Sequence, residues 1–282
     1  MIKKIISFLL DLRDRQLMSI ALSKGGAKKG AREIDLVNPL TWEFSGFSQN
    51  GEDGIIDVLL SQLVNKNYYF IEIGSADGVQ NNSSWLVLVE QYNGLMIEGS
   101  SRLADRAKRL IINHSIGVEC LNMYVNSENI QELKSKALHI NPDVFSLDID
   151  GVDYYVAKAI MDAGFRPKIF VVEYNSVYGP DRSMTIPYRH DFVFSNAHST
   201  QLYYGVSISA WRKLFTNHGY KFIAVDRQGV NAFFVDPTCF NSEFLSKLKS
   251  PEFIENAYQL KKFKGAHEKQ FKLVADQQYV TI

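Results

Sequence analysis

The sequence has few cysteines, no excess of either charge and no long apolar segment. Its two cysteines, Cys120 and Cys239, lack the spacing of a metal site or a redox motif. We expect reduced thiols in a cytoplasmic protein, although two cysteines still allow one disulfide. The 31 basic and 31 acidic residues balance, which argues against a nucleic-acid-binding protein. No apolar run has the length that a membrane-spanning helix needs.

The first part of the chain has the pattern of an amphipathic helix over residues 2–22. Charged residues from Asp11 onward interrupt its apolar positions too early for a signal peptide, and no small-residue cleavage site follows. Residues 24–30, KGGAKKG, are predicted to be a flexible basic linker within an N-terminal extension of residues 1–40. The helix suits peripheral contact with the inner face of a membrane. We favour packing on the domain or on the second subunit of a homodimer.

Strand-like and helix-like patterns alternate over most of the remaining sequence. Such alternation predicts an α/β fold: a Rossmann-like, doubly wound, mostly parallel seven-stranded sheet with helices on both faces. A closing hairpin would add one antiparallel strand. We assign residues 41–240 to this domain and residues 241–282 to a helical tail packed on it. The strands are predicted at residues 69–73, 94–98, 117–125, 144–148, 168–173, 220–226 and 231–236.

The end of the first predicted strand carries the most specific signal. Residues 70–78 read FIEIGSADG, so an acid and two glycines follow a buried apolar run. Glycine lets the backbone approach a ligand without a Cβ clash, and this turn is where α/β sheets bind nucleotide-like ligands. A dinucleotide-binding turn would read G-x-G-x-x-G, which this turn does not. Glu98 ends the next strand, where a carboxylate can accept two ribose hydroxyls.

This pattern resembles that of class I S-adenosylmethionine-dependent methyltransferases. Residues 48–53 (SQNGED), 145–153 (FSLDIDGVD) and 171–175 (VVEYN) resemble the FkbM-like group in particular. The likeness spans roughly residues 47–235 and implies O-methylation of sugars, nucleotide sugars or surface-glycan precursors such as capsule or O-antigen. The cofactor contacts expected from it are Gln49, Glu52, Asp53, Glu72, Gly74, Ser75, Asp77, Gly78, Glu98, Gly99, Asn129 and Asp148.

Acidic residues crowd the ends of the fourth and fifth predicted strands. Neighbouring strand ends face one crevice, where clustered oxygen ligands can hold a divalent cation. By resemblance to metal-dependent O-methyltransferases, Asp148, Glu173 and Asn175 are candidate ligands of Mg²⁺ or Mn²⁺, and Asp150 is the candidate general base. Alternatively, Asp148 and Asp150 hydrogen-bond the loop backbone and the substrate without a metal. Asp153 is predicted to cap the next helix.

Residues 174–205 form a long polar and aromatic segment with little periodicity. Such segments are usually functional or disordered. His190 and His198 lie here and are further candidates for the catalytic base, although lone loop histidines are commonly structural. The tyrosines and arginines around them suit a sugar or phosphorylated sugar, and equally a dimer interface.

Two other functions are compatible with the sequence. One is a catalytically silent methyltransferase-like scaffold that binds a glycan-assembly partner. Gly74, Gly78 and Glu98 count against it, because a scaffold does not need a cofactor site. The other is an NAD-dependent oxidoreductase, which the missing G-x-G-x-x-G disfavours.

Overall fold

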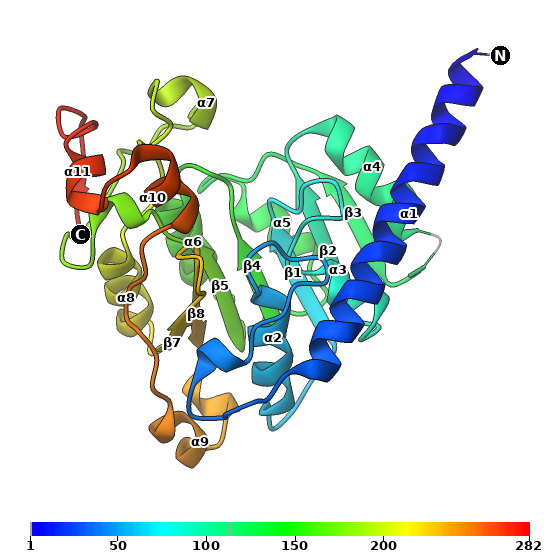
Figure 1. Ribbon diagram of the computed structural model, residues 1–282, viewed down its shortest axis with the longest axis horizontal. Coiled ribbons are helices and arrows are strands. Elements are labelled where there is room, and N and C mark those ends of the chain that lie inside the picture. Colours follow the sequence, from blue (N-terminus) through cyan, green and yellow to red (C-terminus); the bar gives the residue numbers. More distant parts are fainter. Residues whose placement is uncertain (1, 113) are drawn as a thin grey trace.

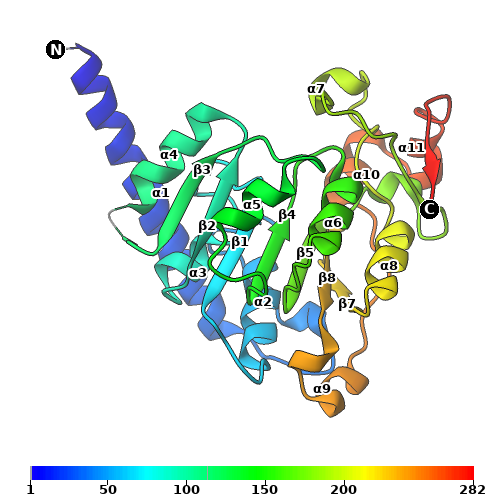
Figure 2. The same ribbon diagram turned by 180° about the vertical axis from the view of Figure 1, so that it is seen from behind.

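The computed structural model describes residues 2–112 and 114–282. Its centre is a seven-stranded sheet of order β3-β2-β1-β4-β5-β8-β7, seen from both sides in Figures 1 and 2. Neighbours among the first five strands are parallel, and β8 is antiparallel to both β5 and β7. This topology confirms the predicted mostly parallel, Rossmann-like sheet of the class I methyltransferase type.

Every predicted strand is present within a few residues of its expected bounds. The strands of this sheet are β1 (Tyr69–Ile73), β2 (Asn93–Glu98), β3 (Val118–Asn122), β4 (Val144–Leu147), β5 (Ile169–Glu173), β7 (Lys221–Val225) and β8 (Asn231–Val235). The flanking helices are α2 (Glu52–Ser61), α3 (Ser84–Leu88), α4 (Ser101–Ile111), α5 (Ile130–Lys136), α6 (Asp153–Asp162) and α8 (Ile208–Asn217).

The two faces of the sheet bury separate apolar cores because successive side chains of a strand point to opposite sides. In β1, Ile71 joins the core beneath α5, α6 and α8, whereas Phe70 joins the core beneath α2 and α3. Both side chains are fully buried. Helices on both faces therefore leave the carboxyl edge of the parallel strands as the place where a site can open.

The N-terminal helix α1 (Ile2–Ala31) is longer than the sequence predicts. Residues 24–30, expected to be a flexible linker, form its last two turns. Gly25 packs so closely on the domain that a Cβ there would lie 2.4 Å from Cζ3 of Trp85. The linker prediction is wrong because Gly25 allows close packing of this helix on the domain. A glycine-rich helix that packs closely and a flexible linker have similar compositions.

Replacing Gly25 with alanine is expected to lower the free energy of unfolding by about 1–3 kcal/mol, since the new methyl group overpacks the contact with Trp85. The adjacent Gly26→Ala is the matched control: nothing lies within 4 Å of a Cβ at Gly26, so alanine should stabilise the helix by up to about 1 kcal/mol. Urea titration of both variants measures the difference. Equal effects of the two substitutions would contradict the observed packing of α1.

The C-terminal tail returns to the long segment 174–205. The tail contains α9 (Ser242–Lys247), α10 (Ala257–Phe263), α11 (His267–Phe271) and β9 (Val280–Thr281), and η3 (Pro237–Cys239) precedes it. The segment contains η2 (Ser176–Tyr178), β6 (Met184–Thr185) and α7 (Phe194–Ala197). β6 and β9 pair as an antiparallel two-stranded sheet, which the sequence did not predict.

Both cysteines, Cys120 and Cys239, are free thiols. Helices long and apolar enough to cross a membrane are absent from the described part of the chain. A short η1 (Pro39–Thr41) connects α1 to the domain.

Candidate functional site

A pocket of about 600 Å³ opens at the carboxyl ends of β1, β2 and β4. Its size is in the usual range for a small-molecule ligand. Five of the predicted cofactor residues line it, and so does the candidate base Asp150. The five are Gln49, Gly74, Glu98, Gly99 and Asp148. We call this the donor pocket.

Glu98 is held in place by two backbone hydrogen bonds. Its Oε2 accepts the N–H of Ala76 at 3.0 Å, and its Oε1 accepts the N–H of Ser100 at 2.8 Å. A carboxylate oxygen has more than one acceptor site, so each oxygen can still take a further donor. The geometry is therefore compatible with the predicted contact to two neighbouring hydroxyls.

Gly74 is required by a neighbouring loop. Its φ is +86°, and a Cβ there would lie 1.6 Å from the carbonyl oxygen of Asp148. Gly78 also has a positive φ and lies outside the donor pocket, and a Cβ there would lie 3.1 Å from Ala107 of α4. The sequence assigned both glycines to cofactor approach. Of the two, Gly74 lines the donor pocket, and the close approach of the Asp148 loop requires a glycine there as well.

Glu72 orders the loop after β1. Its side chain is buried, accepts the hydroxyl of Ser83, and accepts the N–H of Asn82 at 2.8 Å. Burial raises the pKa of Glu72 to about 7. The sequence analysis expects Glu72 to contact the cofactor, whereas in the structure its carboxylate orders this loop. Glu72 does not line the donor pocket.

Five more predicted cofactor residues lie outside the donor pocket. Asp53 shows the reason: its Oδ2 accepts the backbone N–H groups of residues 46–48 at 2.8–2.9 Å. Acidic and amide side chains beside tight loops satisfy backbone donors, and a sequence does not distinguish this use from ligand binding. The five are Glu52, Asp53, Ser75, Asp77 and Asn129. Glu52 accepts a hydrogen bond from the side chain of Asn231, and Asp77 pairs with Arg106. Ser75 is buried, and the Asn129 side chain donates to the carbonyl of Tyr124.

Three carboxylates meet where β4 and β5 end. Asp148, Asp150 and Glu173 each offer one oxygen, and these atoms lie within 4.8 Å of one another. Burial raises the pKa of Asp148 and of Glu173 well above the ordinary range, and the neighbouring carboxylates add to the effect. Withdrawal from bulk water also raises the pKa of Asp150. We call this group the acid cluster.

Asp150 adopts an unusual backbone conformation. Its φ of +52° lies in the left-handed region, where aspartate and asparagine are tolerated better than other residues with a Cβ. Such conformations concentrate at functional sites. This turn brings Asp150 to the rim shared by the donor pocket and the acid cluster.

Asn175 does not belong to the acid cluster. Its amide nitrogen donates to the carbonyls of Leu202 and Tyr204, both at 2.9 Å, and its Oδ1 accepts the N–H of Val177 at 3.1 Å. The structure therefore brings Asp148, Asp150 and Glu173 together and leaves Asn175 out of the group. The hydroxyl of Tyr204 donates to Glu173 at 3.2 Å and closes the cluster on that side.

Two other predictions near the cluster need correction. Asp153 begins α6 and does not cap it; its carboxylate accepts the N–H groups of Ile149 and Gly151 at 2.9 and 2.8 Å and shapes the loop. His190 is exposed. His198 bonds through Nδ1 to Thr200 at 2.8 Å. Neither histidine lines the donor pocket or joins the acid cluster, so the structure does not bring the two to the predicted site.

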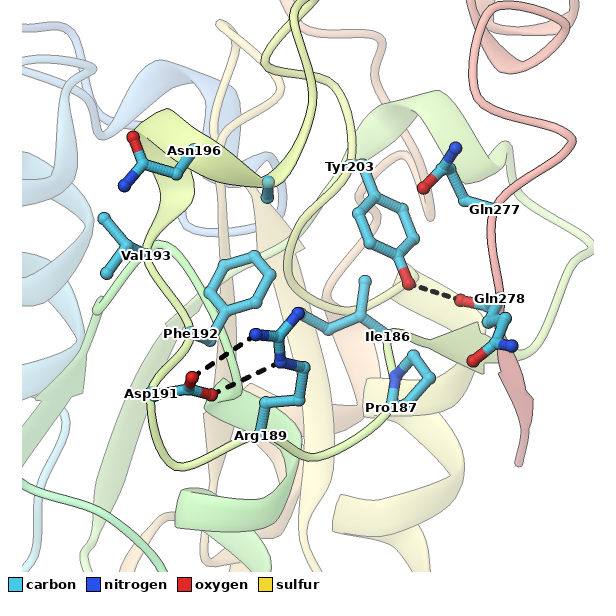
Figure 3. A pocket seen from close by; sticks show the side chains of 11 residues that line it. Ile186, Pro187, Arg189, Asp191, Phe192, Val193, Asn196, Tyr203, Gln277 and Gln278 are labelled. Atoms are coloured by element: carbon cyan, nitrogen blue, oxygen red, sulfur yellow. Dashed lines mark hydrogen bonds and ion pairs between the residues drawn. The ribbon is translucent and has the colours of Figure 1, made fainter.

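A second pocket, of about 440 Å³, lies between residues 186–203 and the C-terminal tail (Figure 3). Arg189 and Asp191 form an ion pair at 3.3 Å in its wall, and the hydroxyl of Tyr203 donates to the carbonyl of Gln278 at 2.6 Å. Its lining is Ile186, Pro187, Arg189, Asp191, Phe192, Val193, Asn196, Ala197, Tyr203, Gln277 and Gln278.

Contacts of Phe192 link the two pockets. Phe192 lines the second pocket, and its ring packs on Gly151, where a Cβ would lie 2.8 Å from the ring. Its carbonyl accepts the hydroxyl of Tyr124 at 3.1 Å, and Tyr124 lines the donor pocket. Phe192 in the lining of the second pocket therefore contacts the residue that follows Asp150 in the sequence.

Sequence reasoning missed several residues of both pockets. Met123, Tyr124 and Val125 follow β3 and line the donor pocket with Leu103. The end of a third parallel strand was the signal that would have found them. Gln277 and Gln278 gave no comparable signal, because the β6–β9 pairing brings them to residues that are distant in the sequence.

Comparison with known protein families gives no match for this sequence, and comparison with curated proteins gives none either. Solved structures with a related fold include an O-methyltransferase from Bacillus cereus in complex with SAH, at 13% identity and a TM-score of 0.41, covering 78% of this chain and 89% of that one. TomG from Streptomyces achromogenes, an O-methyltransferase in complex with SAM, gives 14% identity and a TM-score of 0.42, covering 67% and 80%. The methyltransferase domain of bacterial CtHen1-C has 16% identity and a TM-score of 0.42, and the match covers 65% of this chain and 95% of that one. Values this low do not transfer an activity.

Proposed function

We propose that the chain is an S-adenosylmethionine-dependent O-methyltransferase. The observation that carries this proposal is that a single pocket joins Glu98 to the acid cluster. β1 lies between β2 and β4, so their ends are about 10 Å apart, a span that suits a bound nucleoside with a reactive tail. Glu98 would accept the ribose hydroxyls, and Leu103, Met123 and Tyr124 would contact the base.

When bound, S-adenosylmethionine would supply its methyl group to an acceptor hydroxyl oxygen, and the electron pair of the broken carbon–sulfur bond would stay on sulfur. Asp150 would take the hydroxyl proton. Its raised pKa brings it closer to the working pH and so favours proton acceptance. The remaining contribution of the protein is to position the two reactants.

The acid cluster fits a divalent cation. Its three carboxylates are hard oxygen ligands of the kind that Mg²⁺ or Mn²⁺ prefers, and their mutual repulsion is the charge that such an ion would offset. We propose Asp148 and Glu173 as its ligands, and we keep Asp150 as the base. When bound, the ion would lower the pKa of the acceptor hydroxyl.

Mg²⁺ is expected to raise the thermal stability of chelator-treated protein. An ion present at 100 times its dissociation constant adds about 2.7 kcal/mol to the free energy of unfolding. Glu173→Gln should abolish most of this shift, whereas Glu243→Gln, at an exposed position on α9, should leave it unchanged. Thermal unfolding with and without Mg²⁺ measures it. If Mg²⁺ left the unfolding temperature of the wild-type protein unchanged, the result would favour the alternative in which the acids hydrogen-bond the substrate without a metal.

The second pocket is our candidate for the acceptor site. Phe192 and Tyr203 offer aromatic surface, and Asn196, Gln277 and Gln278 offer amide groups. Together these suit a ring with several hydroxyls, so we propose a sugar, nucleotide-sugar or surface-glycan precursor as the acceptor. Arg189 could also meet a phosphate if its pairing with Asp191 were exchanged.

A panel of nucleotide sugars and free sugars, incubated with methyl-labelled S-adenosylmethionine, tests this acceptor class. The expected result is transfer of label to a hydroxyl of at least one member, lost on Tyr203→Ala. Transfer only to acceptors without a sugar would contradict it.

A further inference from the structure

The outer side of α1 carries an apolar stripe that the domain does not cover. Its described members, Leu9, Leu10, Leu12, Leu17 and Ile20, are between 41% and 62% exposed. The buried side of the same helix carries Asp14, Met18 and Gly25. The helical period places Leu9, Leu12 and Ile20 on the side away from Asp14 and Met18, with Leu10 and Leu17 at the border between the two sides. The stripe is thus unused by the fold.

The inner side of α1 is firmly attached. Asp14 pairs with Arg106 of α4 at 2.8 Å. Lys29 reaches Asp57 and Glu90 at 2.6 and 2.9 Å. Attachment along this side fixes the direction in which the stripe points.

The first turns of α1 extend past the domain. Asp14 lies opposite Arg106, and Met18 packs with Leu110, so α1 and α4 run in the same direction. α4 begins at the carboxyl end of β2. The first turns of α1, from Ile2 onward, therefore project beyond the edge at which the donor pocket opens (Figures 1 and 2).

Charge is divided unevenly between α1 and the rest of the chain. α1 contains seven basic residues, Lys3, Lys4, Arg13, Arg15, Lys24, Lys28 and Lys29, and two acidic residues, Asp11 and Asp14. This leaves α1 at +5, and because the whole chain sums to zero, the remainder carries −5. Arg13, Arg15, Lys24 and Lys28 are exposed.

We propose that the outer side of α1 docks on an anionic lipid bilayer. Exposed aliphatic side chains flanked by lysine and arginine are the features of a helix that lies in the membrane interface, and each basic residue near an anionic surface adds to the attraction. A second copy of this chain fits the same stripe less well, because it would bring two helices of +5 together.

Co-sedimentation of the full chain with phosphatidylcholine vesicles, and with vesicles that also contain phosphatidylglycerol, tests the proposal. The expected result is binding to the anionic vesicles alone, weakened by added salt. Replacing Leu12 and Ile20 together with glutamate should weaken binding at least about tenfold. Leu138→Glu is the matched control, because Leu138 is 73% exposed on another part of the surface and its replacement should leave binding unchanged.

Three results would overturn the proposal. One is no binding of the wild-type chain to anionic vesicles. Another is equal binding by the α1 double variant, whose folded state is checked by its unfolding transition. The third is a dimer in sedimentation equilibrium that dissociates in the α1 variant, which would assign the stripe to a second copy.

Discussion

Asp150→Asn is expected to lower the rate of methyl transfer by about 10²–10⁴-fold, the usual contribution of a positioned general base. Asparagine tolerates the left-handed backbone at this position, so the variant should keep the φ of +52° and remove only the proton acceptor. The affinity for S-adenosylhomocysteine should change by less than about twofold, because the predicted donor contacts are made by other residues. Turnover of the best acceptor and calorimetric titration measure the two quantities.

Asp162→Asn provides the control for Asp150→Asn. Asp162 lies on α6 and pairs at the surface with Lys158 at 2.5 Å, so neither activity nor affinity should change. Retained turnover in Asp150→Asn would remove Asp150 from the role of base. A large loss of donor affinity would make Asp150 a contact of the donor and not the base.

Gly74→Ala is expected to lower the free energy of unfolding by about 3 kcal/mol or more. An alanine Cβ would stand 1.6 Å from the carbonyl oxygen of Asp148, so the backbone of the β4 loop must move. The positive φ of +86° adds strain for any residue with a Cβ. The displaced loop carries Asp148 and Asp150, so donor binding should also be lost.

The Gly78→Ala variant separates this clash from simple backbone strain. Its φ is also positive, at +77°, but a Cβ there would lie 3.1 Å from Ala107, which is a milder contact. Chemical denaturation should therefore show a clearly smaller loss for Gly78→Ala. Equal losses at the two positions would mean that backbone conformation, and not the approach of the β4 loop, makes Gly74 necessary.

The sheet and the place of its site could be predicted because both follow from local pattern. Apolar strands that alternate with amphipathic helices allow few arrangements, and parallel strands put their ends at one edge. Glu98 ends β2 and Asp148 follows β4, the two strands beside β1, and both residues line the donor pocket. Position at a strand end was sufficient to find them.

The use of an individual side chain could not be predicted in the same way. Asp53 and Asn175 occur in polar turns like ligand residues, yet their oxygen atoms accept backbone N–H groups. Whether a loop satisfies its own donors depends on its path in three dimensions. The β6–β9 pairing brings Gln278 to the second pocket. Each of these strands has two residues, which is too short for a recognisable strand pattern in the sequence.

Calorimetric titration of the protein with S-adenosylhomocysteine, beside a titration with NAD, tests the central claim most directly. We predict binding of S-adenosylhomocysteine at one site, no binding of NAD, and a loss of about 1–3 kcal/mol of binding free energy in Glu98→Ala, which removes two ribose hydrogen bonds. Binding of NAD alone, or of neither ligand, would contradict the assignment of the donor pocket.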